Sequence, residues 1–338
     1  MSFGIVAQGH ALGRPVSVAE AAERYGADEH RLAGLGYRRL HRADDGEGLT
    51  DLALRAAESA LRRAEVAAAD LDLVVLALPD VPEYLYWDAA AALQGRLGAT
   101  GAEAVLIAQA CSGGVTAFDT VAGRLATHPD HDTALIVAAN RITEAYWDRT
   151  ATGTSLSSDG AAAAVLRRGH GSGVWLATET ISDGRYADFM RMETGGAARP
   201  FRADAPEPAV IAPLIDRMDT FFAGDGRATY DFMTLMHARN REVLTKACAR
   251  AGLTPGALER VLYLHDNIGA FRDLAKELGI PLEATNAELA LSMGHFGPAD
   301  QLLSLERLSA AGELVEGDTV ALLSMGTGMH WTCTLLRI

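Results

Sequence analysis

The stretch that decides the fold is RAEVAAADLDLVVLAL, residues 63–78, because the chain carries it twice. It aligns without gaps on RAGLTPGALERVLYLH, residues 250–265, at an offset of 187 residues (250 − 63). Each copy has the pattern of a helix end, a short turn and a buried strand. The segments that precede them, residues 49–64 and 237–251, both show an amphipathic helical period. The chain therefore contains an internal repeat.

Two further matches follow in the same order. DTALIVAAN at residues 132–140 matches DTVALLSMG at 318–326, an offset of 186. Between these pairs, ACSGGVTAFDTVAGRLA at 110–126 corresponds to GHFGPADQLLSLERLSA at 294–310. Three ordered matches predict a duplication. Strands that alternate with helices predict a layered α/β architecture.

The length agrees with a duplicated chain. At 338 residues the protein is long for one hydrophobic core. We expect one half at residues 1–170, which carries a candidate nucleophile, and a second at residues 171–338, with a Gly-rich tail.

Composition excludes several function classes. Hydrophobic residues make up 49% and charged residues 22%, as in an ordinary soluble globular protein. A net charge of −14 argues against nonspecific nucleic-acid binding. No apolar run approaches the roughly 20 residues that cross a bilayer, so no membrane contact is expected. We find no Walker loop, dinucleotide fingerprint or metal-ligand spacing, and so expect no resident metal or cofactor.

The cysteines indicate the compartment. Cys111, Cys248 and Cys333 lie far apart, without any CxxC pair. This sparse, odd set, together with the lack of a secretory leader, predicts a cytoplasmic protein. Cys248 and Cys333 are expected to be packing residues.

Cys111 stands where a buried strand ends and a helix begins, in LIAQACSGGVTAFDTVAGRLA at residues 106–126. The thiolate is the reactive form of cysteine, and a helix N-terminus favours an anion there. The small residues around the sulfur leave room for a thioester and permit a tight turn: Ala110, Ser112, Gly113 and Gly114. From the residues alone, a catalytic nucleophile and a buried structural cysteine both stay open.

The repeat gives Cys111 a counterpart. At an offset of 184, His295 lies opposite it, and each residue opens its helix. If the halves pack about a pseudo-twofold axis, the thiol and the imidazole meet at the centre. Asp300 lies in the first turn after His295, where it either complements the helix dipole or bonds His295 and fixes its tautomer.

Five segments in order resemble the thiolase superfamily and, within it, the ketoacyl-ACP synthase III branch. They are GYRRLHRADDGEGLTDLALRAAESAL, AQACSGGVTAF, SLSSDGAAAAVL, LHDNIGAF and SMGTGMHWTCTLLRI. The resemblance covers nearly the whole chain. It implies a thiolase-like duplicated, layered α-β-α-β-α fold with pseudo-twofold halves, and a homodimer. It also implies an acyl-CoA or phosphopantetheinyl-ACP thioester as acyl donor.

The resemblance assigns the site residues, and this sequence departs from the family pattern at one of them. Condensing enzymes of this branch use a cysteine, a histidine and an asparagine, and the first two map to Cys111 and His265. The asparagine position holds His295, in a G-H-x-G-x-x-D turn. That turn is similar to a subgroup of acyltransferases and starter-unit enzymes in antibiotic and polyketide pathways. The subgroup's triad would be Cys111, His295 and Asp300, and the role of His265 stays open between catalysis and packing.

Further positions follow from the same resemblance. An oxyanion hole is expected from the backbone amides of Cys111 and Thr327. The residues expected to bind substrate are Tyr84, Tyr86, Trp87 and Asn267. The three aromatic residues would line an acyl pocket, across the dimer or within it, or equally form the dimer core. Asn267 lies two residues after the histidine, where the family has three.

The expected function is transfer of an acyl group from a carrier-protein or CoA thioester, through Cys111, to a hydroxyl or amine of a small natural-product intermediate. The first alternative is decarboxylative condensation, because ketosynthases with a cysteine and two histidines also exist. The second is a non-catalytic partner subunit of another synthase. Asp300 favours transfer, because a decarboxylating pair does not require it.

Overall fold

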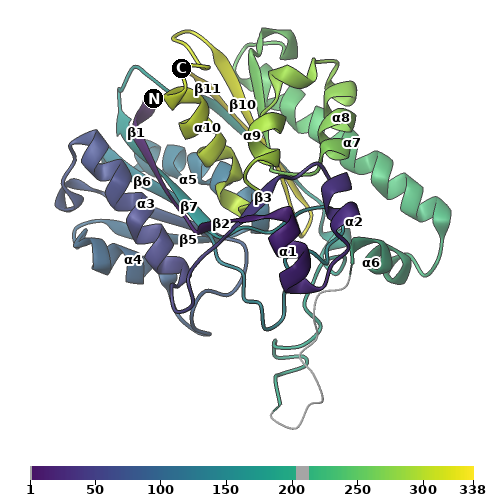
Figure 1. Cartoon of the computed structure of the whole chain (residues 1–338). Coiled ribbons are helices and arrows are strands. Elements are labelled where there is room, and N and C mark those ends of the chain that lie inside the picture. The colour runs from purple at the N-terminus through teal and green to yellow at the C-terminus, as the bar shows by residue number, and fades with distance from the viewer. Residues whose placement is uncertain (1, 203–212) are drawn as a thin grey trace.

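Two β-sheets with the same strand order form the centre of the molecule. The computed structural model describes residues 2–202 and 213–338 (Figure 1). The first sheet has the order β1-β7-β6-β4-β5. Its strands are β1 (Phe3–Leu12), β4 (Leu73–Leu78), β5 (Glu103–Ala108), β6 (Thr133–Asn140) and β7 (Gly160–Arg168). β4 pairs in parallel with β5 and β6, whereas β7 is antiparallel to β1 and β6.

The second sheet has the order β8-β11-β10-β9. Its strands are β8 (Val174–Ser182), β9 (Arg260–Tyr263), β10 (Thr319–Gly326) and β11 (His330–Arg337). A single parallel bridge between Val261 and Thr285 takes the place that β5 has in the first sheet. The two sheets therefore repeat one topology. The matched segments at 132–140 and 318–326 are β6 and β10, as the duplication predicts.

Helices form three layers around the two sheets (Figure 1). Helices α3 (Leu49–Ala64) and α4 (Ala89–Leu97) cover the first sheet, and α7 (Gly226–Arg250) with α8 (Ile268–Leu278) lies on the outer side of the second. Between the sheets lie α5 (Gly113–Thr127) and α10 (Asp300–Ala310), each in contact with strands of both. The expected thiolase-like α-β-α-β-α fold is confirmed. The division into two units at residue 170 stays a prediction.

The sequence pattern explains these layers. β4 and β6 are buried along their whole length, because helices cover both faces of the sheet. In α3 the buried residues recur at spacings of three and four, which places Leu52, Ala56 and Ala60 on the face toward the sheet. In α10 the buried set includes the polar residues Asp300, Gln301 and Ser304. Polar groups buried in a central helix indicate a functional centre, because they require partners there.

The remaining elements are short, and two of the 3₁₀ turns among them lead into the central helices α5 and α10. They are β2 (Arg14–Ser17) and β3 (Arg39–Arg42), the helices α1 (Val18–Tyr25), α2 (Glu29–Gly34), α6 (Leu214–Phe221) and α9 (Ala287–Leu291), and the 3₁₀ turns η1 (Ala68–Asp70), η2 (Ala110–Ser112), η3 (Gly184–Tyr186), η4 (Pro255–Ala257), η5 (Leu282–Ala284) and η6 (Gly297–Ala299). Across the two described ranges, none of the helices combines the length and apolarity needed to cross a bilayer.

Candidate active site

Cys111 and His295 meet at the centre of the molecule. The Cys111 Sγ lies 3.3 Å from the His295 Nε2, although 184 residues separate them in sequence. Cys111 lies in η2, directly before α5, and His295 lies two residues before η6, which leads into α10. The tips of the two central helices thus bring together the pair that the repeat predicts.

Backbone geometry at Cys111 favours an exposed sulfur. Ala110, the residue before it, has a φ of 46°, a left-handed conformation that residues other than glycine seldom adopt. Such strain is found mainly at functional sites. Cys111 itself is half-buried. The Cys111 carbonyl accepts a hydrogen bond from the Ser324 hydroxyl at 2.8 Å, which anchors this turn to β10.

Asp300 orients the imidazole of His295. The His295 Nδ1 lies 2.6 Å from the Asp300 Oδ2. The carboxylate is fully buried and also accepts the backbone N–H groups of Phe296, at 2.6 Å, and His265, at 2.7 Å. A carboxylate that already accepts two amides takes the Nδ1–H of His295 as a third. The Nε2 therefore faces the Cys111 sulfur.

Charges at the site stabilise an imidazolium. Burial alone would lower the pKa of His295, but the Asp300 carboxylate and the Cys111 sulfur together raise that pKa well above its usual value. Burial would raise the pKa of Asp300, but His265, His295 and the backbone amide lower it, so this carboxyl group is ionised. The three side chains can hold a proton on His295 and release it to a reacting group.

His265 has a different place from the one expected. It is fully buried, its Nδ1 lies 2.8 Å from the Gly294 carbonyl, and its Nε2 lies 2.8 Å from the Ser304 hydroxyl. Because a carbonyl only accepts, Nδ1 carries the proton and Nε2 accepts from Ser304. Burial lowers the pKa of His265, and the nearby Asp300 carboxylate opposes that shift. Neither ring nitrogen is free for substrate, and the backbone N–H of His265 binds Asp300, so these contacts favour a positioning role; a catalytic role for His265 stays an untested prediction.

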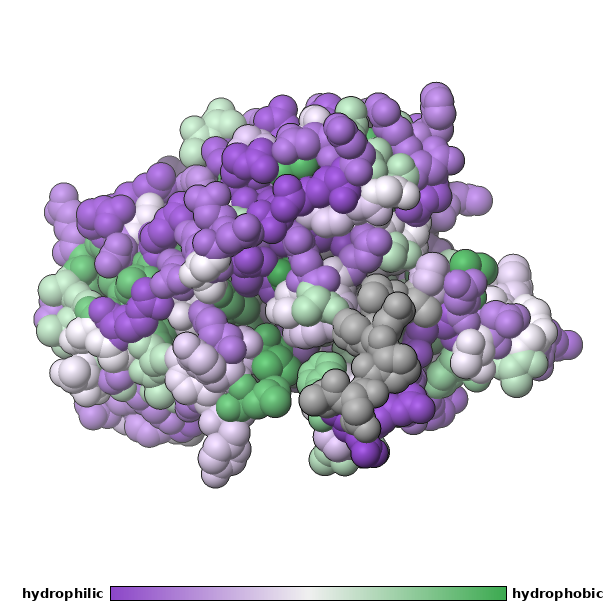
Figure 2. Space-filling view, turned by 60° about the horizontal axis from the view of Figure 1, so that its bottom comes forward, coloured by the Kyte–Doolittle hydropathy of each residue, from purple (hydrophilic) through white to green (hydrophobic). Residues whose placement is uncertain are grey.

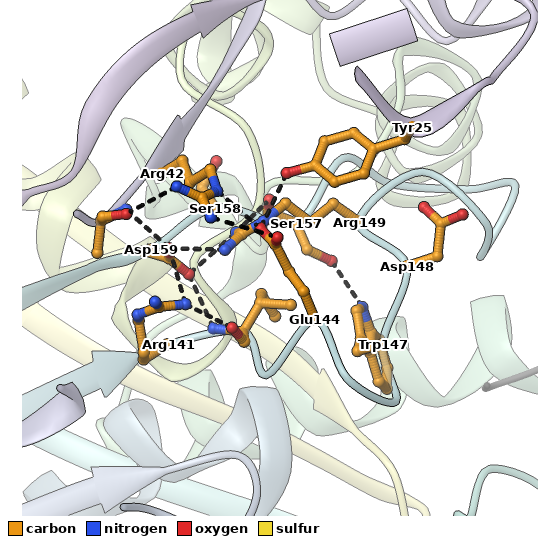
Figure 3. Close-up of polar contacts among 12 residues, drawn as sticks. Tyr25, Arg42, Arg141, Glu144, Trp147, Asp148, Arg149, Ser157, Ser158 and Asp159 are labelled. Carbon is orange, nitrogen blue, oxygen red and sulfur yellow. Dashed lines mark hydrogen bonds and ion pairs between the residues drawn. The ribbon is translucent and has the colours of Figure 1, made fainter. Parts of the chain in front are cut away.

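The backbone of His295 rests on a neighbouring segment. The His295 N–H donates to the Leu156 carbonyl at 2.8 Å, and the Ser158 N–H donates to the His295 carbonyl at 2.7 Å. Directly after Ser158, the Asp159 carboxylate is held by Arg149 through two hydrogen bonds of 3.0 and 2.7 Å. Both side chains are fully buried (Figure 3). This ion pair fixes the segment on which His295 lies.

The ion pair belongs to a larger polar network (Figure 3). Glu144 accepts hydrogen bonds from the Arg149 Nε at 2.7 Å, the Arg42 Nε at 2.9 Å and the Tyr25 hydroxyl at 2.9 Å. Burial would raise the pKa of Glu144, but the two arginines lower it to about 2. The network joins the N-terminal elements α1 and β3 to the segment beneath the site.

Two cavities meet at Cys111 and His295, and both residues, together with Thr327, line each of them. The first, called the Trp147 cavity, measures about 380 Å³, and Ile142, Tyr146 and Trp147 are among its other lining residues. The second, called the Asp266 cavity, measures about 370 Å³ and lies toward α7 and α8. A sulfur open on two sides can hold an acyl group in one cavity while a second reactant approaches from the other.

The two residues expected to form the oxyanion hole, Cys111 and Thr327, line the same cavities. Thr327 follows β10 directly and reaches both cavities beside Cys111. Cys111 lies in the first turn of its helix, where backbone N–H groups lack intrahelical partners. The roles of the two amides stay a prediction.

The aromatic residues expected to bind substrate do not line either cavity. Tyr84 and Tyr86 project from the loop after β4, with side chains 66% and 110% exposed, and Trp87 packs edge-on against Tyr84 at 5.2 Å. In a single chain these residues lie outside both cavities, so their role in an acyl pocket across a dimer, or in the dimer core, stays a prediction. In Figure 2 the upper part of the visible face is mostly hydrophilic, and hydrophobic side chains are found mainly in its lower half. Asn267 does line the Asp266 cavity, where it caps α8.

Sequence reasoning missed Trp147, Asp266 and Ser304. Trp147 and Asp266 line the cavities, and Ser304 binds the ring of His265. Asp266 adjoins a segment already singled out, so its position was a usable signal. Trp147 lies in an irregular loop without a periodic pattern. No cluster of three metal-ligating side chains occurs in residues 2–202 or 213–338.

Comparisons with known proteins find similarity to one family over nearly the whole chain. Residues 107–184 match the family described as 3-oxoacyl-[acyl-carrier-protein (ACP)] synthase III, and residues 248–338 match its C-terminal part. The beta-ketoacyl-[acyl-carrier-protein] synthase III of Gloeobacter violaceus is 31% identical, with 92% of this chain and 90% of that protein covered. The enzyme of the same name from Synechocystis sp. is 30% identical, with the same coverage. Among solved structures, the acyltransferase ChlB3 is 28% identical, with a TM-score of 0.87, and the match covers 100% of this chain and 98% of that one.

Proposed function

The chain belongs to the 3-oxoacyl-[acyl-carrier-protein] synthase III family, and within it we propose that the protein is an acyltransferase with Cys111 as its nucleophile. It would accept an acyl group from a carrier-protein or CoA thioester. It would then pass that group to a hydroxyl or amine of a small molecule. The similarity to the acyltransferase ChlB3 supports this choice within the family.

The mechanism has two halves. In the first, the Cys111 sulfur attacks the thioester carbonyl, the carbon–sulfur bond of the donor breaks, and the departing thiolate takes a proton from His295. Acylation neutralises the sulfur and so removes one of the two groups that raise the pKa of His295. In the second half, the imidazole can therefore take the acceptor's proton, with Asp300 stabilising the imidazolium. Backbone amides at Cys111 and Thr327 would hold the oxyanion in both halves.

The observation that carries the proposal is that the ring of His265 is hydrogen-bonded inside the protein and does not reach either cavity. Both of its ring nitrogens are bonded inside the protein, and the ring does not line either cavity. Condensing relatives use a histidine and an asparagine beside the cysteine. Among the residues that the structure describes, a single imidazole, that of His295, contacts the sulfur, and Asp300 binds its other nitrogen. A cysteine with one oriented base supports acyl transfer.

Decarboxylative condensation is the second candidate, because the relatives named above are beta-ketoacyl-[acyl-carrier-protein] synthases III. The two reactions differ in one product. We expect malonyl carrier protein labelled at the free carboxyl group to release no labelled carbon dioxide in the presence of acylated protein. Release at the rate of product formation would establish condensation instead.

Covalent chemistry at Cys111 needs its own test. Intact mass after incubation with a panel of acyl thioesters should show one acyl adduct on the wild type and none on Cys111→Ala. The His295→Ala variant should acylate slowly and fail in transfer. An adduct that persists in Cys111→Ala, or a wild type without any adduct, would favour a non-catalytic partner subunit.

We also propose a homodimer formed through β5. This strand is the edge of the first sheet, and Leu106 is exposed on it. Open edge strands tend to pair with another chain unless they are blocked. β4 is the strand next to β5 in the sheet. The loop that follows β4 exposes further apolar side chains: Val81, Tyr84, Leu85 and Tyr86. Light scattering should give a dimer for the wild type and a monomer for Leu106→Glu; a wild type that is monomeric would exclude the proposal.

A further inference from the structure

The Asp266 cavity carries a carboxylate that the acyl-transfer mechanism does not use. Asp266 follows β9 and is half-buried at the cavity wall. Its Oδ1 accepts the Asn267 backbone N–H at 2.7 Å and the Asn267 Nδ2 at 2.9 Å. Asn267 is itself fixed, because its Nδ2 also donates to the Thr154 carbonyl at 3.0 Å. The carboxylate therefore has a defined orientation.

The other oxygen of this carboxylate is available to a ligand. No hydrogen bond or ion pair to the Asp266 Oδ2 occurs within residues 2–202 and 213–338. Asp266 lines the same cavity as Cys111 and His295. A carboxylate held on one side and open on the other can accept a hydrogen bond from a molecule that lies beside Cys111.

The charge of the cavity restricts that molecule. A second carboxylate, Asp273, lines the cavity at an exposed position of α8, and the described lining residues include no lysine or arginine. His237 and His295 also line this cavity, so its wall is not uniformly acidic, but the two carboxylates disfavour a phosphate or carboxylate group beside them. Such a wall favours a neutral ligand that donates hydrogen bonds, or a cation.

The apolar part of the wall is adaptable. Five methionines line the cavity: Met190, Met233, Met236, Met325 and Met329. Methionine is unbranched and polarizable, so it fits apolar surfaces of irregular shape. Together with Asp266, this wall suits a molecule that has apolar C–H surface and several hydroxyl groups, such as an alicyclic polyol or a glycoside.

We propose that Asp266 binds a hydroxyl group of a polyhydroxylated acceptor in this cavity while the acyl group lies in the Trp147 cavity. The inference rests on the acyl transfer proposed above. In the transfer step, a second hydroxyl oxygen of the acceptor forms a bond to the acyl carbon, and the carbon–sulfur bond to Cys111 breaks. The hydroxyl proton passes to the His295 Nε2 and from there to the Cys111 sulfur.

Asp266 also selects a hydroxyl over an amine. A carboxylate beside an amine stabilises the ammonium form, which lacks the lone pair needed for attack. A hydroxyl group stays neutral beside a carboxylate and keeps its nucleophilic electrons. The acceptor class is thereby narrowed from hydroxyl or amine to a compound with at least two hydroxyl groups.

The test compares two acceptors that differ by one hydroxyl group, trans-cyclohexane-1,2-diol and cyclohexanol. The donor is the N-acetylcysteamine thioester that acylates Cys111 fastest in a panel. We expect the wild type to use the diol with a kcat/KM at least 10-fold above that for cyclohexanol. Asp266→Asn keeps the Oδ1 contacts to Asn267 and places an N–H donor where Oδ2 was. It should bring the ratio close to 1, mainly by raising the KM for the diol.

Asp231→Asn is the control, because Asp231 is exposed on α7 and does not line the cavity. It should keep the wild-type ratio. The proposal is overturned if the wild type uses the two acceptors equally, or if Asp266→Asn leaves the ratio unchanged. It is also overturned if transfer occurs only to cyclohexylamine, a thiol or water. Absence of any Cys111 adduct would instead overturn the acyl transfer on which it rests. If Cys111 forms the acyl adduct but the diol is not preferred, only the proposal for Asp266 is overturned, and the acyl transfer stands.

Discussion

Gly114 and Pro298 touch so closely that no side chain fits between them. A Cβ at Gly114 would lie 2.1 Å from the Pro298 carbonyl oxygen. Gly114 is the second residue of α5 and Pro298 lies in η6, so this contact joins the two helix tips that carry Cys111 and His295. The 3.3 Å separation of sulfur and imidazole depends on this approach.

Gly114→Ala should separate the two tips. We expect the rate of Cys111 acylation to fall by about 10²-fold, because a misplacement of about 1 Å is enough for such a loss. The rate is measured by intact mass against time. Gly123→Ala is the matched control on the same helix, where nothing lies within 4 Å of the added Cβ. It should keep the rate and raise the free energy of unfolding by about 0.5–1 kcal/mol. Equal rates in both variants would contradict the contact's role.

Asp300→Asn should abolish most of the transfer while the fold persists. An amide nitrogen cannot accept the Nδ1–H of His295, so the ring loses its tautomer and the charge that stabilises the imidazolium. In a triad this change costs about 10⁴-fold in kcat, and we expect a loss of about 10³–10⁴-fold here. Steady-state transfer and the unfolding transition are measured together.

The control for Asp300→Asn removes another buried carboxylate from the same helix. Glu306 pairs with Arg63 at 2.6 Å and with His10 at 3.1 Å, away from both cavities. Glu306→Gln should lower stability and keep kcat. If Glu306→Gln loses as much kcat as Asp300→Asn, the loss in Asp300→Asn comes from disturbed packing of the helix and not from the hydrogen bond to His295.

The repeat in the sequence predicts the architecture because strand order follows from chain order. The offsets between copies locate β6 and β10 and place Cys111 opposite His295 before any contact is seen. The bond from His295 to Asp300 is also predictable, because a spacing of five residues spans the turn that opens the helix. These features depend on the backbone path alone.

Side-chain direction at strand ends is what the sequence does not determine. His265 ends the buried stretch after β9, and only Ser304 from α10 and the Gly294 carbonyl decide that its ring turns inward. Tyr86 lies in a loop whose path depends on neighbours elsewhere in space. The pair of Arg149 and Asp159 lies in an irregular segment, where no period marks buried charge.

Arg149→Met should destabilise the protein strongly. The variant leaves the Asp159 carboxylate buried without its guanidinium partner, a change that typically costs about 3–5 kcal/mol. Urea unfolding measures the difference. Arg62→Met is the control, because Arg62 and Glu58 form an exposed pair at 3.9 Å, and such pairs contribute about 0–1 kcal/mol.

A double variant separates the ion pair from other contacts of Arg149. Arg149→Met with Asp159→Asn should lose less stability than the two single changes added together, because the buried charge is then absent. Strict additivity would show that the two side chains act independently. In that case the segment beneath His295 is held by its backbone hydrogen bonds alone.

Selectivity for a diol over cyclohexanol should fall in acid. Burial raises the pKa of Asp266 to about 6. Above that pH the Oδ2 accepts a hydroxyl hydrogen bond as a carboxylate, and below it the protonated group is neutral and binds the second hydroxyl more weakly. The ratio of the two kcat/KM values, measured between pH 4.5 and 8, should therefore decline as pH falls through about 6. Both acceptors need His295 equally, so its titration cancels in the ratio. Asp266→Asn should give a ratio independent of pH, and a constant ratio in the wild type would contradict the role of this carboxylate.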